Sequence, residues 1–247
     1  AVPVMVFLHG GGNAGGTPNM NFSTFVDETD VIVVSVEFRQ GAFGWLQSKA
    51  LKTGNKYTDS GNFAMLDIKL ALEWVRDNIG FFGGVAGNVT HSGFSAGARD
   101  SLNAMISPIM TGLFHKVVSF SGGMTTCSKQ EGRKWTDEKL AKILVRRGRF
   151  SKKKWALRYV KRMSAKKKKK LLYSLSDKEI KKMAGSSGLR LTNFPQCFRD
   201  GTVIPKDGFD CLEYGGYHRV PMIIATNRSE FANMSYKSMQ RILTKGA

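Results

Sequence analysis

The chain has 247 residues, of which 42% are hydrophobic, so it is long and apolar enough to bury a sizeable core. No apolar run reaches the length that a bilayer-spanning helix needs, and no signal peptide is recognisable at the N-terminus, which leaves the compartment open. The three cysteines, Cys127, Cys197 and Cys211, are not spaced like zinc ligands and cannot all pair within one chain.

The net charge of +19 is concentrated in the middle of the chain. Residues 129–183 contain 22 Lys and Arg against 5 Asp and Glu, whereas residues 1–128 contain 8 against 9. This distribution indicates a local basic feature within an otherwise ordinary fold.

Outside that middle segment, strand and helix patterns alternate along the chain. Residues 2–8 and 31–36 are continuous apolar runs rich in β-branched side chains, as in strands that are buried on both faces. Apolar residues at positions 64, 68, 71, 75 and 79 recur at helical spacing. A strand near Val89, a helix over about 98–106, and strands at 116–120 and 221–225 follow. The alternation predicts an α/β fold with a mostly parallel sheet flanked by helices.

The basic segment predicts several short helices. Thr136 and Ser151 each precede a helical pattern and are candidate N-caps, and Ser176 with Glu179 forms a capping-box signature. Residues 193–208 then have the glycine and proline content of a connection.

Two glycine-containing turns carry the chemistry. Residues 93–97 form a G-x-S-x-G pentapeptide between a strand pattern and a helical pattern, which is the setting of a nucleophile elbow centred on Ser95. His9 and the glycines at 10–12 directly follow the first strand, and a glycine-rich turn there is suited to presenting backbone N–H groups to an oxyanion.

Several segments together resemble the type-B carboxylesterases, the cholinesterase-like branch of the α/β-hydrolases. They are, in family order, PVMVFLHGGG, VIVVSVEFR, SGNFAMLDIKLALEWVRDNIGFFGG, NVTHSGFSAG, GLFHKVVSFSGG, FRDGTVIP and VPMIIATNRSE. The resemblance covers most of residues 1–125 and 194–235, while 129–183 match loosely. It implies one partial α/β-hydrolase domain over 1–247, with 129–183 as a basic helical region inserted in it.

The resemblance also implies hydrolysis of a carboxylic ester through a serine acyl-enzyme. By position, Ser95 corresponds to the nucleophile and Glu230 to the acidic member of the triad. The backbone N–H groups of Gly11, Gly12 and Ala96 correspond to the oxyanion hole. The implied substrate is a small ester, and no metal or organic cofactor is implied, because serine acyl transfer requires none.

The sequence departs from the family pattern in three places. None of the four histidines matches the catalytic histidine, so that residue is absent from this chain. Phe94 stands where the family usually has glutamate, and Val85 where it usually has aspartate. We therefore expect a chain that is incomplete at both ends and inactive on its own.

A second reading is a non-catalytic module with the hydrolase fold, whose basic helices bind an acidic partner. Lysine runs at 152–154 and 166–170, with Trp155 and Tyr173 nearby, could contact nucleic acid or an anionic surface. A solvated basic helical face explains the same runs, and we favour that interpretation.

Overall fold

The centre of the molecule is a five-stranded, fully parallel sheet. The computed structural model describes residues 1–184 and 196–230. The strand order is β2-β1-β3-β4-β7, and the strands are β1 (Val2–Leu8), β2 (Ile32–Val36), β3 (Gly84–Phe94), β4 (Lys116–Phe120) and β7 (Met222–Ala225). This confirms the α/β class and the parallel sheet predicted from the sequence.

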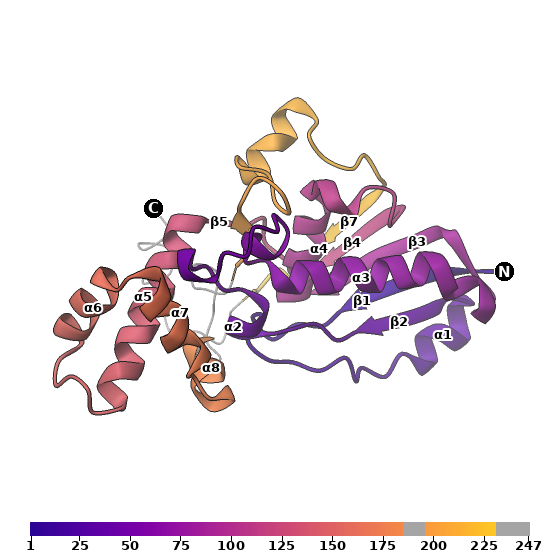
Figure 1. Ribbon diagram of the computed structural model, residues 1–247. Coiled ribbons are helices and arrows are strands. Elements are labelled where there is room, and N and C mark those ends of the chain that lie inside the picture. The colour runs from indigo at the N-terminus through magenta and orange to yellow at the C-terminus, as the bar shows by residue number, and fades with distance from the viewer. Residues whose placement is uncertain (185–195, 231–247) are drawn as a thin grey trace.

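One face of the sheet carries the main core (Figure 1). Val4, Val6 and Leu8 of β1 point to that face, where they join α3 (Phe63–Asn78) and α4 (Ala96–Ile106) in one cluster of buried side chains. Ala64, Ile68 and Val75 of α3 are fully buried, as the apolar periodicity predicts, and α4 is buried along its whole length.

Among residues 1–184 and 196–230, less of the chain covers the opposite face of the sheet. The short α1 (Ser23–Thr29) has no buried residue and lies at one margin of this face (Figure 1). A cavity of about 700 Å³ lies between α1 and the strands of the sheet. Its apolar lining includes alternate residues of the strands, namely Met5, Phe7, Phe94, Val118, Phe120 and Ile223.

The basic segment forms four helices: α5 (Lys129–Arg146), α6 (Lys153–Arg162), α7 (Ala165–Tyr173) and α8 (Asp177–Ala184). Figure 1 shows them gathered at one side of the sheet. Because α8 contacts α2 (Gly41–Gly44), which follows β2, this side lies beyond the carboxyl ends of the strands.

Two of the three predicted helix caps in this segment are wrong. Thr136 lies inside α5, where its hydroxyl donates to the carbonyl of Gly132, and the helix begins instead after Ser128 in a capping box with Glu131. Ser151 is also not a cap, since α6 starts after Lys152 without a side-chain cap. The Ser176–Glu179 capping box is confirmed: each backbone N–H bonds to the other residue's side chain.

Short elements connect the rest. In the described part of the chain, 3₁₀ turns lie at Lys49–Leu51, Thr58–Ser60, Ile79–Phe82, Pro108–Met110 and Gly208–Tyr214. A parallel pair of two-residue strands, β5 (Cys127–Ser128) and β6 (Phe198–Arg199), joins the start of α5 to the later part of the chain. Within the described ranges, no helix has both the length and the apolar character needed to cross a membrane.

Candidate active site

The sheet topology brings the predicted site segments to one edge. In the register, Leu8 pairs with Gly93, Phe94 with Phe120, and Phe120 with Ala225. The segments that follow these strands therefore leave the sheet side by side: the glycine turn after β1, Ser95 after β3, Ser121 after β4, and residues 226–230 after β7. Crevices outside the carboxyl ends of parallel strands are where α/β proteins bind ligands.

Ser95 occupies a strained turn between β3 and α4. Its backbone has φ 56° and ψ −113°, a conformation that residues other than glycine rarely adopt. Two backbone hydrogen bonds hold it: the Ser95 N–H donates to the carbonyl of Phe120 at 2.8 Å, and its carbonyl accepts from the Arg99 N–H at 3.0 Å. The residue is half-buried, and its hydroxyl has no hydrogen-bond partner among the described residues. The serine is thus presented at the sheet edge with a free hydroxyl.

The glycine turn packs directly against this serine. A Cβ atom on Gly10 would lie 3.2 Å from the Cβ of Ser95 and 3.1 Å from the carbonyl oxygen of Phe94, so a larger residue would fit only if these neighbours shifted by a few tenths of an ångström. Gly11 and Gly12 have positive φ angles of 117° and 65°. Ala96 is buried as the first residue of α4, where backbone N–H groups lack partners within the helix.

A buried pair ties the glycine turn to α4. Asn13 donates from Nδ2 to Oδ1 of Asp100 at 3.0 Å, and both side chains are buried. Burial raises the pKa of Asp100 to about 7, against smaller opposing effects of Arg99 and Asn13. The sequence alone provides no account of Asp100; the structure shows that it anchors the turn.

Glu230 reaches the same edge through Ser121. The Ser121 hydroxyl donates to Oε1 of Glu230 at 2.5 Å, and the Asn227 N–H donates to the same oxygen at 3.0 Å. The side chains of Thr226 and Asn227 add contacts to Oε1 at 3.3 Å. The Ser121 hydroxyl, and then the Asn227 N–H, lower the pKa of Glu230, which favours the carboxylate.

The four histidines are all among the described residues, and none bonds to Ser95. Three have partners elsewhere: His9 stacks on Phe38, His115 accepts from the Val89 N–H at 3.2 Å, and His218 donates to the carbonyl of Ser107 at 2.7 Å. The fourth, His91, is fully buried, neither of its ring nitrogens has a partner in the described part of the chain, and burial lowers its pKa to about 3.

Ser121 is the site residue that the sequence analysis missed. Its backbone has φ 55°, and its N–H donates to the carbonyl of Ala225 at 2.8 Å. It directly follows the predicted strand 116–120, so a search for polar residues just after each strand would have found it. Phe94, beside the serine, is exposed at the mouth of the apolar cavity.

Comparisons with known proteins identify the family of this chain. The family model described as "Carboxylesterase family" matches residues 1–246. Carboxylesterase 3 of Homo sapiens is 32% identical over 232 residues, covering 93% of this chain and 36% of the human protein. The para-nitrobenzyl esterase of Bacillus subtilis is 29% identical over 239 residues, covering 93% of this chain and 44% of that enzyme.

Solved structures give the same result. A PNB esterase superposes with a TM-score of 0.72 at 27% identity, covering 95% of this chain and 47% of that one. A carboxylesterase of Geobacillus stearothermophilus superposes with a TM-score of 0.75 at 25% identity, covering 99% of this chain and 50% of that enzyme. The chain thus spans half or less of the length of these relatives. The match over nearly all of its residues shows that the chain belongs to the carboxylesterase family.

Proposed function

We propose that this chain carries the nucleophile half of a serine carboxylic ester hydrolase. The observation that carries the proposal is the backbone of Ser95, which is held in a strained conformation that leaves its hydroxyl free at the sheet edge. Such strain persists only where surrounding contacts enforce it, and it is typical of functional residues.

In the proposed reaction, the Ser95 oxygen attacks the ester carbonyl carbon while its proton passes to an imidazole base. The tetrahedral intermediate collapses, the alcohol leaves with that proton, and Ser95 retains the acyl group as an ester. Water then attacks the acyl-enzyme by the same route, which releases the acid and restores the serine. The substrate class we propose is a small, largely uncharged ester.

The backbone N–H groups of Gly11, Gly12 and Ala96 are the proposed donors to the oxyanion. The close approach of Gly10 to Ser95 supports this role, since it places the glycine turn beside the reacting oxygen. The Asn13–Asp100 bond would hold the turn in that position. Loss of one such donor in related sites raises the barrier by roughly 3–4 kcal/mol.

Glu230 is the proposed carboxylate that orients the imidazole. All of its hydrogen bonds to described residues fall on Oε1, so Oε2 is the oxygen left to accept an imidazole N–H. The imidazole itself is not supplied by any of the four histidines of this chain, and the proposed mechanism needs one from outside these 247 residues.

We also propose that residues 1–247 form one partial α/β-hydrolase domain with 129–183 inserted in it. The supporting observation is that the helices of this segment pack against elements on both sides of it in the sequence. They contact α2 and the 49–51 turn before the segment and β6 after it.

A fluorophosphonate probe, which labels activated serines, tests the catalytic proposal. In the longest gene product that contains this sequence, we expect labelling at Ser95, located by peptide mass spectrometry. Labelling should disappear in Ser95→Ala and persist in Ser23→Ala, which removes an exposed hydroxyl of α1. Absence of labelling in a folded product that contains a downstream histidine would overturn the proposal in favour of a non-catalytic hydrolase-fold module.

A further inference from the structure

A second, smaller cavity lies within the basic helical segment, at the junction of α5 and α8. Its volume is about 170 Å³, and its lining consists of Lys139, Lys142, Ile143, Arg146, Lys182 and Met183. It therefore combines four cationic side chains with two apolar ones, and the ester hydrolase mechanism uses none of them.

Two helices supply the charges in a regular arrangement. Lys139, Lys142 and Arg146 are spaced by three and four residues, which places them on one face of α5, while Lys182 comes from α8. Ile143 and Met183 are buried and pack with Ala42 of α2, so the base of the pocket belongs to a packed core.

Four of the five acidic residues of the segment are engaged elsewhere. Asp137 pairs with Lys168, Glu138 with Lys153 and Glu179 with Arg147, and Glu131 caps α5. Neither Lys142, Arg146 nor Lys182 forms an ion pair with any residue in the described ranges. Like charges at this spacing on a helix destabilise it, so the pocket holds a repulsion that a bound anion would relieve.

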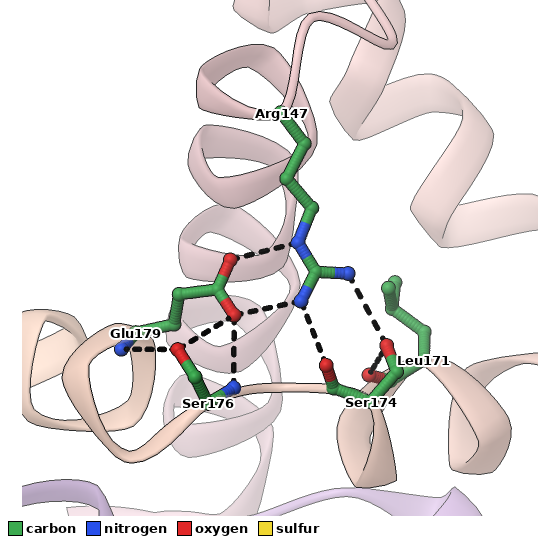
Figure 2. A network of polar contacts seen from close by, with 5 residues as sticks. All are labelled: Arg147, Leu171, Ser174, Ser176 and Glu179. Carbon is green, nitrogen blue, oxygen red and sulfur yellow. Dashed lines mark hydrogen bonds and ion pairs between the residues drawn. The ribbon is translucent and has the colours of Figure 1, made fainter.

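A hydrogen-bond network fixes the two walls relative to each other (Figure 2). Arg147, the C-cap residue directly after α5, bonds to both carboxylate oxygens of Glu179 at 2.7 Å and to the carbonyl of Ser174 at 2.8 Å. Arg146 is its neighbour in the chain, and Lys182 lies one turn beyond Glu179. The cations at the pocket therefore stand on a scaffold that is already held together before any ligand binds.

We propose that this pocket binds a multiply charged oxyanion, above all a phosphate group. Its small volume, about 170 Å³, suits one or two tetrahedral oxyanion groups rather than an extended polymer. Arginine and lysine are the side chains that recognise phosphate oxygens, through paired and single charge-assisted hydrogen bonds respectively. This function is independent of ester hydrolysis.

Calorimetric titration and thermal unfolding of the whole chain with inorganic pyrophosphate test the proposal. The site variant is Lys142→Gln with Arg146→Gln. The matched control is Lys166→Gln with Lys170→Gln, which removes the same charge at the same spacing from exposed positions of α7. We expect pyrophosphate to raise the unfolding temperature of the parent. The site variant should bind about tenfold more weakly or worse, and the control should bind as the parent does.

Three outcomes would overturn the site. The first is no response of the parent to pyrophosphate at low salt. The second is an equal loss of affinity in both double variants, which would mean diffuse attraction to the basic surface. The third is tight binding of a single-stranded RNA that pyrophosphate cannot displace.

A further expectation concerns the protein without pyrophosphate. Because the site variant removes two of the mutually repelling cations of the pocket, it should unfold at a higher temperature than the parent.

Discussion

At the residue scale, the local environment is least favourable at His91. The structure buries its imidazole completely, next to Phe114, and neither nitrogen has a hydrogen-bond partner among the described residues. A buried polar group without hydrogen bonds costs roughly 1–3 kcal/mol, so His91 is a site where the sequence gives up stability.

We predict that His91→Val stabilises the fold by about 1 kcal/mol near neutral pH, measured by urea unfolding, because it removes this penalty in a similar volume. The lowered pKa adds a pH dependence. The unfolded chain binds the proton at about pH 6.5 and the folded chain only near 3, so the parent loses stability as pH falls through this window.

His91→Val should lack that part of the acid sensitivity. His218→Val is the control, because it removes a histidine that donates to the Ser107 carbonyl, and it should lower stability instead. A His91→Val protein that is less stable than the parent at neutral pH and shows the same acid dependence would contradict this account.

At the element scale, the sequence predicted the strands, helices and caps that depend on apolar periodicity and on residues close together in the chain. The strands at 2–8 and 116–120 and the helix over 64–79 follow from apolar periodicity, and the Ser176–Glu179 capping box from residues three apart. The start of α5 carries a local signal of the same kind, because Ser128 and Glu131, three residues apart, form the capping box there. The prediction of Thr136 as the N-cap missed this signal.

The candidate site likewise divides into parts that local motifs predict and parts that depend on contacts between distant segments. Ser95 and the glycine turn belong to local motifs and could be predicted. The link from Ser121 to Glu230, and the anchoring of Asn13 by Asp100, depend on strand order and packing between distant segments. Single-sequence patterns contain no information about such contacts.

The Arg147–Glu179 pair sets the position of α8, and it gives a prediction at this scale. Arg147 lowers the pKa of Glu179 to about 2, with help from the Ser176 N–H. Glu179→Gln should therefore lower the unfolding free energy by about 1 kcal/mol at neutral pH, as expected for a well-formed but partly exposed pair.

The sign of the pH dependence follows from the lowered pKa. The stabilisation by Glu179 is present above its ordinary value of 4.5 and is lost as pH falls toward 2. Chemical unfolding at several pH values should show the parent and Glu179→Gln converging in acid. Asp177→Asn, two residues earlier on the same helix, is the control and should not converge in this way. A constant gap between parent and Glu179→Gln would refute the role assigned to this pair.

At the scale of the whole molecule, the two faces of the sheet are unequal. The face under α3 and α4 is a closed core, whereas the other carries the 700 Å³ apolar cavity, whose lining includes Ile223 of the edge strand β7, a side chain that is 62% exposed. Contiguous exposed apolar surface of this kind binds hydrophobic dyes and promotes self-association. We therefore expect the folded chain to bind an anilinonaphthalene sulfonate dye with enhanced fluorescence.

Ile223→Lys tests whether this face causes the dye binding and self-association. The substitution places a charge within the cavity lining and leaves the closed core untouched. It should reduce the dye fluorescence and shift light-scattering measurements toward the monomer, with little change in unfolding temperature. Leu70→Lys is the matched control, because Leu70 is 67% exposed on α3, away from the cavity. Equal effects of the two substitutions would mean that dye binding reflects general surface hydrophobicity or loosened packing. A selective effect of Ile223→Lys would show that the exposed sheet face governs the solution behaviour of the chain.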